Sequence, residues 1–415
     1  MPTVTEICRN ARRAAPSVAR LTSQVKDDAL RAMADELERS SADLQAANAA
    51  DVERARADGA SETIVDRLRL TDDRVASMAA GLRSVAAQPD PVGEIVEGWT
   101  RPNGLQIEKV RVPLGVVAVI YEARPNVTAD VAGLCLKSGN ACVLRGSSTA
   151  VDSNRAIVAA LTAAASAHGV GRDTIQLIDD TDRASALELM RAKGLVDLLV
   201  PRGGRALIQT IEENATVPFI IDGDGNCHVY VDSSADPDMA TKIIVNAKTQ
   251  RPSVCNAAET LLVHAEAAEK WLPSALDALA DRGVTIRGDD RVLDLWERAE
   301  PATEEDWATE YLDLRLAVRV VDSLDAAIEH VNRFGTSNAD AIVTQDLGAA
   351  RRFVREVDSG SVFVNASTRF SDGSEFGYGS EIGISTQKLH ARGPMGLREL
   401  TAQRYVVWGE GQVRT

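Results

Sequence analysis

The chain has 415 residues, of which 45% are hydrophobic, 26% charged and 4% aromatic, a composition typical of a soluble globular protein with two or three domains. Its 46 basic and 61 acidic residues give a net charge of −15, which argues against non-specific nucleic-acid binding because the phosphate backbone attracts positive surfaces. No run of about 18 apolar residues occurs, so no membrane-spanning helix is expected.

The cysteines and histidines show no metal-ligand spacing. The five cysteines are Cys8, Cys135, Cys142, Cys227 and Cys255. They lack the C-x₂₋₄-C pattern of a zinc site, and the five histidines form no pair at ligand spacing. We therefore expect no metal, and free thiols in a reducing cytoplasm.

Residues 1–95 alternate apolar and charged positions at helical spacing and predict helices, for example at 29–38 and 64–70. Residues 98–112 then alternate apolar and polar side chains around Asn103-Gly104, a strong hairpin signal.

Short runs rich in Val and Ile follow and predict buried strands. They lie at 115–121, 141–144, 174–178, 196–200, 219–221 and 228–231. Because segments of helical period separate most of them, the pattern predicts a parallel sheet covered on both faces, as in a Rossmann-like domain. The alternation restarts near residue 236 and reaches residue 364, which predicts a second α/β domain.

Cys255 has an unusually positive neighbourhood. Lys248 lies seven residues before it, Arg251 four residues before it, and Asn256 directly after it. Nearby cations favour the thiolate, which is the nucleophilic form of cysteine. The alternative is a buried structural cysteine, the commoner situation for a single Cys.

Two strand-to-helix turns offer groups for an anion. Arg202-Gly203-Gly204 follows a strand and precedes a helix, where backbone N–H groups bind dinucleotide phosphates. Arg145 ends another strand and is a candidate for a ribose hydroxyl or its 2′-phosphate. The alternatives are a plain tight turn at Gly203-Gly204 and an Arg145 that satisfies nearby carbonyl groups.

Asn126 follows a third strand, in a turn that Pro125 makes non-helical before it. Its amide is a candidate donor to an oxyanion that develops on a carbonyl under thiolate attack. A helix N-cap is the commoner role for such an Asn.

A long polar, glycine-rich stretch runs from about residue 365 to 395. Loops of this length are usually functional or disordered, and the aromatic residues in this one argue against disorder. Arg369 and Arg392 are its cations that could meet a carboxylate or phosphate.

Taken together, these segments resemble the aldehyde dehydrogenase superfamily, specifically the branch that reduces L-glutamyl 5-phosphate. The resemblance covers essentially the whole chain and is carried by residues 112–128, 135–146, 200–204, 246–262, 364–370 and 383–397.

The resemblance implies a three-part chain with a Rossmann-like cofactor domain, an α/β catalytic domain and a small β arm for oligomerisation. The expected NADP-binding domain comprises 1–97 and 113–235, the catalytic domain comprises 236–394, and the arm comprises 98–112 and 395–415.

The resemblance also implies NADPH-dependent reduction of L-glutamyl 5-phosphate to glutamate 5-semialdehyde through a cysteine thioester, in proline biosynthesis. Cys255 matches the family nucleophile, Asn126 the oxyanion-hole amide, and Arg145 a lysine that touches the adenosine ribose in many relatives. We expect the substrate phosphate near Arg251, with Lys248 and Arg369 as further candidates. A homo-oligomer and an association with glutamate 5-kinase are further expectations.

One departure from the family pattern is informative. Hydrolytic relatives carry a glutamate that activates the deacylating water, whereas residues 222–228 here contain none. This favours a reductive, phosphate-exchanging reaction and leaves the role of Asp222 open. The sequence also leaves open NADPH against NADH, an ordinary oxidising aldehyde dehydrogenase, and a catalytically silent nucleotide-binding protein.

Overall fold

The computed structural model describes residues 2–221 and 223–414. The chain forms two compact units. The first comprises Met1–Ile221, Gly377–Gly383 and Met395–Thr415, and the second comprises Asp222–Phe376 and Ile384–Pro394. Within the described residues, no helix has the length and apolarity needed to cross a bilayer.

The first unit is built on a four-stranded parallel sheet of order β5-β4-β3-β6. Its strands are β3 (Val116–Tyr121), β4 (Ala141–Gly146), β5 (Ile175–Leu177) and β6 (Leu198–Arg202). All residues of β3 are buried, as expected for a strand covered on both faces.

Helices surround this sheet. The helices of the first unit are α1 (Val4–Val18), α2 (Ser23–Arg39), α3 (Ser41–Ala57), α4 (Glu62–Leu68), α5 (Asp72–Ala87), α6 (Asn126–Lys137), α7 (Val151–Ala167), α8 (Arg183–Met190) and α9 (Arg205–Asn214), with short 3₁₀ turns η1 (Ser148–Ala150) and η2 (Arg172–Thr174). Helices α1 and α8 share a hydrophobic cluster with alternate residues of β3, namely Val116, Ala118 and Ile120. The remaining core includes α2 and α5, which pack on α6.

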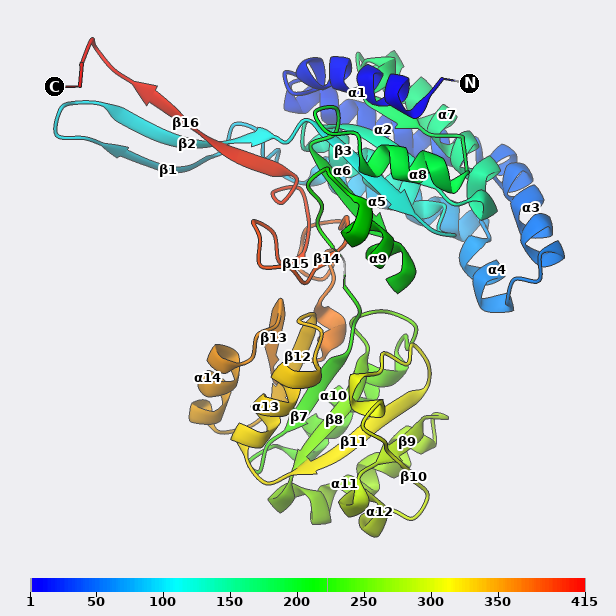
Figure 1. Cartoon of the computed structure of the whole chain (residues 1–415), viewed down its shortest axis with the longest axis vertical. Helices are drawn as coiled ribbons and strands as arrows, with labels where there is room; N and C mark the ends of the chain where they lie inside the picture. Colours follow the sequence, from blue (N-terminus) through cyan, green and yellow to red (C-terminus); the bar gives the residue numbers. More distant parts are fainter. Residues whose placement is uncertain (1, 222, 415) are drawn as a thin grey trace. The chain divides into compact units, whose positions relative to one another are not determined.

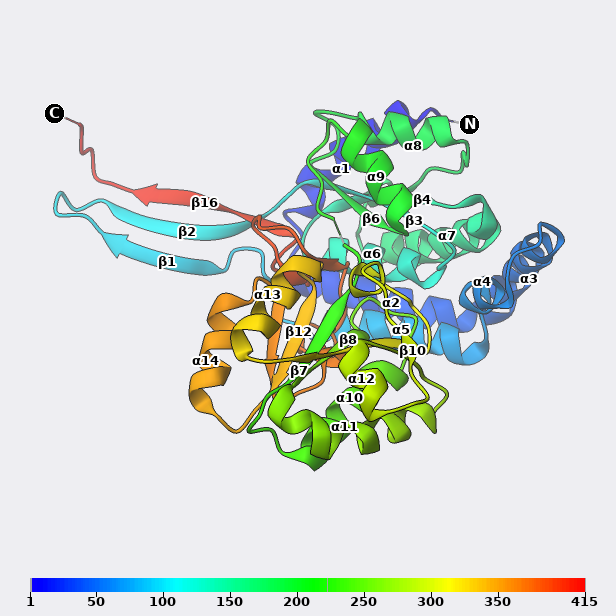
Figure 2. The ribbon, with the colours of Figure 1, turned by 60° about the horizontal axis from the view of Figure 1, so that its bottom comes forward.

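A three-stranded antiparallel arm belongs to the same unit (Figures 1 and 2). Strands β1 (Ile95–Thr100) and β2 (Gln106–Pro113) form the predicted hairpin, and β16 (Thr401–Trp408) pairs with β2. Gly104 has a φ of 85° in the turn, a conformation that glycine adopts without strain. The arm exposes Trp99, Tyr405 and Trp408.

The second unit is built on a seven-stranded parallel sheet of order β10-β9-β11-β8-β7-β12-β13. Its strands are β7 (Cys227–Val231), β8 (Ala258–His264), β9 (Thr285–Gly288), β10 (Glu300–Pro301), β11 (Arg315–Val321), β12 (Ala339–Val343) and β13 (Ser361–Val364). The helices are α10 (Pro237–Thr249), α11 (Ala265–Ala280), α12 (Asp290–Leu295), α13 (Leu324–Phe334) and α14 (Leu347–Glu356), with 3₁₀ turns η3 (Asp306–Ala308) and η4 (Thr368–Phe370). Two short strands, β14 (Ile384–Ser385) and β15 (Gly393–Pro394), pair with each other.

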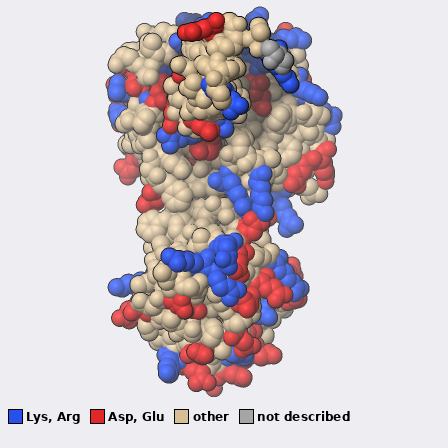
Figure 3. All heavy atoms as spheres, turned by 90° about the vertical axis from the view of Figure 1, so that its left-hand side faces the viewer, with Lys and Arg blue, Asp and Glu red and all other residues tan. Residues whose placement is uncertain are grey.

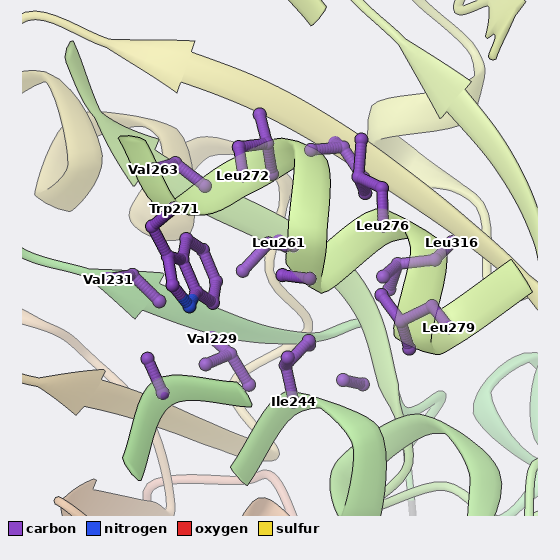
Figure 4. Close-up of a cluster of buried hydrophobic side chains, with 14 of the residues drawn as sticks. Val229, Val231, Ile244, Leu261, Val263, Trp271, Leu272, Leu276, Leu279 and Leu316 are labelled. Atoms are coloured by element: carbon purple, nitrogen blue, oxygen red, sulfur yellow. The ribbon is translucent and has the colours of Figure 1, made fainter. Parts of the chain in front are cut away.

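Alternate strand residues face opposite helix layers in this unit. Val229 and Leu261 point toward α10 and α11, where they meet Ile244 and Leu272 (Figure 4). Tyr230, between two such residues, packs instead with the cluster of α13 and α14. This two-residue period is what a strand buried on both faces requires.

The predicted fold class is confirmed, but one detail differs from the sequence predictions. Residues 219–221 do not form a strand, and Phe219 makes an isolated bridge with Leu199. Strand β7 belongs to the second compact unit, because it pairs with β8 and β12 of the second sheet.

The net negative charge does not make the surface uniformly negative. Acidic and basic side chains are interspersed on the face that Figure 3 shows. A local cluster of cations is therefore needed to hold any anionic ligand.

Candidate active site

Cys255 lies in the loop between α10 and β8, the nucleophile loop (residues 250–257). Its side chain is half-buried, whereas the other four cysteines are buried, and all five are free thiols. The loop is closed by a turn in which Ala257 N donates to Val254 O over 3.1 Å. The structure therefore gives Cys255 the partial exposure that a reactive thiol needs.

Arg251 and Arg369 both lie close to Cys255. Arg251 is exposed and makes no hydrogen bond or ion pair with the described residues. The half-buried Arg369 donates through Nε to Gln250 Oε1 over 2.8 Å. Burial lowers the pKa of Arg369, and the charge of Arg251 lowers it further, while the Cys255 thiolate acts in the opposite direction. These predicted residues form one electropositive group.

Lys248 is different, and its predicted role as a phosphate contact does not fit the structure. Its side chain is fully buried, and Nζ pairs with the equally buried Glu259 Oε2 at 2.5 Å. Burial lowers the pKa of Lys248 and raises that of Glu259 to about 7, each against the attraction of its partner. An ammonium held in this way has no open side for a substrate anion, so we assign Lys248 to the packing beneath the loop.

Asn126 is the first residue of α6 in the first unit, and its side chain is exposed. Its Nδ2 donates to Asp130 Oδ2 over 3.0 Å. The N-cap residue of α6 is Pro125, without a side-chain cap bond, so Asn126 does not play the alternative N-cap role. Burial raises the pKa of Asp130 to about 6, against the opposing effects of Asn126 and of nearby Arg202.

Three strand ends of the first sheet form what we call the cofactor edge (Glu122, Arg145 and residues 202–204). Gly204 precedes α9, and a Cβ there would meet nothing within 4 Å. Its N–H already has a protein partner, since it donates to Glu122 Oε2 over 3.2 Å. A Cβ on Gly203 would come within 2.7 Å of Glu122 Cδ, so a larger residue here would displace the Glu122 side chain.

Arg145 satisfies carbonyl groups, which is the alternative left open by the sequence. Its Nη2 donates to Thr181 O over 2.8 Å and to Asp182 O over 3.0 Å. Burial lowers its pKa, against the opposing charges of Asp180 and Asp182. Its Nε is buried without a hydrogen-bond partner.

These features fit a nicotinamide dinucleotide. The N-terminus of the ten-residue helix α9 suits a phosphate, because there is free space around Gly204. The Nε of Arg145 has no hydrogen-bond partner and is a donor that a ribose or phosphate oxygen can satisfy. Arg202, Gly203 and Gly204 would hold the phosphates, and Arg145 the ribose side.

The other candidate residues are less directly connected to the site. Arg392 donates to Asp358 Oδ1 and to Asp358 O, which gives it a structural partner. Asp222 lies outside the described residues. Among the residues that the structure describes, His, Cys, Asp and Glu do not gather in threes at a metal-holding geometry.

Sequence reasoning missed Glu122, Glu259 and Cys227. Glu122 occupies the Gly204 N–H, Glu259 neutralises Lys248, and Cys227 Sγ donates to Cys255 O over 3.2 Å. The available signal was weak, since Glu122 directly follows a strand and Cys227 begins one.

Comparison with known proteins gives consistent matches. A family model described as the aldehyde dehydrogenase family matches residues 2–290 and 316–405. The chain is 57% identical to "Gamma-glutamyl phosphate reductase" of Moorella thermoacetica, over 98% of this chain and 97% of that protein. It is 56% identical to the protein of the same name from Thermobifida fusca, over 99% and 98%. The crystal structure of gamma-glutamyl phosphate reductase from Thermotoga maritima superposes with a TM-score of 0.97 and is 45% identical, with 100% of both chains covered.

Proposed function

The chain belongs to the aldehyde dehydrogenase family, whose members use nicotinamide cofactors, and we propose that it reduces L-glutamyl 5-phosphate to L-glutamate 5-semialdehyde and phosphate with NADPH. This is the second step of proline biosynthesis from glutamate. The relatives from Moorella thermoacetica and Thermobifida fusca are both named gamma-glutamyl phosphate reductase. Each is more than half identical to this chain along nearly its full length, which supports the same reaction here.

The observation that carries the proposal is the half-buried Cys255 beside Arg251 and Arg369. A thiolate next to two guanidinium groups is both a nucleophile and a neighbour of an anion site. An acyl phosphate brings its electrophilic carbon and its anion in one molecule. Arg251 is free of protein partners among the described residues and is the first choice for the substrate phosphate.

In the first step, the Cys255 thiolate attacks the acyl carbon and a C–S bond forms. The carbon–oxygen bond to phosphate breaks, and phosphate leaves with the electron pair without needing a proton. We assign the Cys255 N–H and the Asn126 amide to the developing oxyanion. Arg369 and Arg251 then stabilise the departing anion.

When bound, the reduced nicotinamide supplies the hydride that brings the thioester to the aldehyde level. Arg145, Arg202, Gly203 and Gly204 are our candidates for holding the dinucleotide. Glu122 must release the Gly204 N–H if that group is to donate to a phosphate, because one N–H of a helix terminus cannot serve both acceptors well. Arg145 Nε, which is buried without a hydrogen-bond partner, favours a 2′-phosphorylated cofactor in this proposal, with Arg202 as a second cation at the same edge.

The arm of β1, β2 and β16 supports a proposal of homo-oligomerisation. It exposes Trp99, Tyr405, Val407 and Trp408, and exposed apolar side chains that are grouped on one element are typical of an interaction surface. Association with glutamate 5-kinase would shield the labile acyl phosphate, and together with a cytoplasmic location it remains part of this proposal.

Phosphate dependence of the reverse reaction tests the function. The purified protein should oxidise glutamate 5-semialdehyde with NADP⁺ only when inorganic phosphate is present, because phosphate must release the acyl group from Cys255. An ordinary oxidising aldehyde dehydrogenase would turn over without phosphate, and a silent nucleotide-binding protein would not turn over at all. Repeating the assay with NAD⁺ measures the cofactor preference.

A further inference from the structure

Cys255 lies between two peptide groups whose carbonyl oxygens both accept hydrogen bonds. On the N-terminal side, Ala257 N donates to Val254 O over 3.1 Å. On the C-terminal side, the Cys227 thiol donates to Cys255 O over 3.2 Å. Because each peptide is planar, fixing both planes fixes the backbone dihedrals of Cys255 and hence the direction of its Cα–Cβ bond.

Cys227 is suited to remain a donor. It is fully buried at the start of β7. Burial raises the pKa of Cys227 well above its ordinary range, and the nearby carboxylate of Asp340 and the Cys255 thiolate act in the same direction. The thiol therefore keeps its proton at neutral pH, so the hydrogen bond to Cys255 O persists.

Gly225 brings the two segments into direct contact. A Cβ on Gly225 would lie 1.7 Å from Cys255 O and 2.4 Å from Cys255 Cα, so no other residue fits without moving the nucleophile. Gly225 N donates to Glu310 Oε1 over 2.7 Å, which anchors this segment in turn.

Asn256, the residue after Cys255, is held by hydrogen bonds with a different segment of the chain. Asn256 Nδ2 donates to Ser371 O over 3.0 Å, and Thr368 Oγ1 donates to Asn256 O over 2.7 Å. These bonds hold Asn256 but not the carbonyl of Cys255. That carbonyl is held by Cys227, so Cys227 controls the plane nearest the reacting sulfur.

We propose that Cys227 is a positioning residue: its thiol holds the Cys255 carbonyl and thereby aims the Cys255 sulfur, with Gly225 providing the close contact. The inference rests on the proposed function, in which Cys255 is the nucleophile. Cys227 itself forms no covalent bond in the reaction. Misplacing a reacting atom by about 1 Å costs up to about 10²-fold in rate, so loss of this hydrogen bond lowers kcat rather than substrate affinity.

The test compares Cys227→Ala, which removes the donor, with Cys227→Ser, which keeps one. Cys8→Ala is the matched control, because Cys8 is equally buried but lies in α1 of the first unit. Three quantities are measured: kcat and KM in the phosphate-dependent oxidation assay, the melting temperature, and the rate at which iodoacetamide alkylates Cys255, followed by mass spectrometry of its peptide.

We expect Cys227→Ala to lose about tenfold to hundredfold in kcat, with both KM values within about twofold of the wild type. Alkylation of Cys255 slows in the same variant. Cys227→Ser recovers kcat to within about threefold, because a hydroxyl donates to the same carbonyl. Cys8→Ala keeps the wild-type kcat although it also loses a buried thiol.

Two results would overturn the proposal: wild-type kcat and alkylation in Cys227→Ala, or equal losses in the Ala and Ser variants. If Cys227→Ala does not fold, Cys227→Val fills the volume without a donor and must show the same loss. The alkylation ranking needs no substrate. A wild-type protein without phosphate-dependent oxidation therefore refutes the proposed function, while the alkylation rates still decide the role of Cys227.

Discussion

The cofactor edge and the nucleophile loop hold their cations and donors in different ways. At the cofactor edge the groups that the sequence selects are already bonded to protein atoms: Arg145 to two carbonyl oxygens and the Gly204 N–H to Glu122. In the nucleophile loop the backbone carbonyl of Cys255 accepts a hydrogen bond from Cys227, whereas the Arg251 side chain is exposed.

This difference shows that a residue can lie near the candidate site and still have no group available to bind a ligand. Lys248 and Arg251 are three positions apart, yet one is buried in an ion pair and the other faces solvent. Proximity in sequence to a nucleophile therefore does not make a cation a ligand. Each of the following variants tests one side of this comparison.

Lys248→Met should cause the largest change, and it should be a change in stability. The substitution leaves Glu259 buried without its counter-charge, which costs about 3–5 kcal/mol in the free energy of unfolding. Urea denaturation measures this cost. Lys242→Met is the control on the same helix, because Lys242 is exposed, and it should change stability by less than about 0.5 kcal/mol. A stable Lys248→Met protein with a raised KM for phosphate would restore the phosphate role that the sequence predicted.

Asn126→Ala should lower kcat by about 10²–10³-fold, the usual cost of removing one oxyanion donor. Asn126 is exposed, so the melting temperature should change little. Steady-state kinetics at saturating phosphate and cofactor measure the effect. A kcat near that of the wild type would remove Asn126 from the mechanism.

Arg251→Met should raise the KM for phosphate about tenfold or more, because a charge-assisted hydrogen bond is lost. The free energy of unfolding should stay the same, since Arg251 has no hydrogen-bond or ion-pair partner among the described residues. Arg315→Met, another exposed arginine of the second unit, provides the control. An unchanged KM for phosphate would leave Arg369 as the better candidate.

Acid should reduce activity through Asp130. Its carboxylate accepts from Asn126 Nδ2, and its pKa is raised to about 6. Protonation below that value weakens the bond that orients the amide, so kcat should fall on the acid side with a midpoint at about pH 6. Asp130→Asn should flatten this part of the kcat profile between pH 5 and 7. An unchanged midpoint in that variant would assign the acid limb to another group.

Glu122→Gln should have the smallest effect, a gain of about twofold to fivefold in NADPH affinity. The substitution removes a negative charge from the N-terminus of α9, where such a charge contributes about 0.3–1 kcal/mol, so the neutral side chain competes less strongly with the pyrophosphate for this helix end. Titration of nicotinamide fluorescence measures it without turnover. Weaker binding in this variant would show that Glu122 contacts the cofactor itself.

The sequence predicted most of the fold because buried parallel strands appear as short apolar runs. The runs 115–121, 141–144 and 228–231 correspond to strands β3, β4 and β7 of the structure. Residues 219–221 have the same apolar character but make only an isolated bridge between Phe219 and Leu199, because the chain leaves the first sheet there. An apolar run indicates that a segment is buried. Whether it forms a strand depends on a neighbouring strand to pair with, and the sequence of the run does not show that neighbour.

The sequence alone could select candidate residues for the site but could not predict their contacts. Cys255, Arg251 and Arg369 could be selected from charge and loop length. The partners that decide availability lie far away in the chain: Glu122 is 82 residues from Gly204, and Cys227 is 28 residues from Cys255. Those pairs exist only once parallel strands place their ends side by side.

Acylation of Cys255 without cofactor tests the central claim most directly. The protein is mixed with L-glutamyl 5-phosphate, freshly made by a kinase, and quenched rapidly for phosphate analysis and mass spectrometry. The account predicts a burst of phosphate equal to the enzyme concentration and a glutamyl group on the peptide that contains Cys255. No burst, or the same burst in Cys255→Ser, would contradict it.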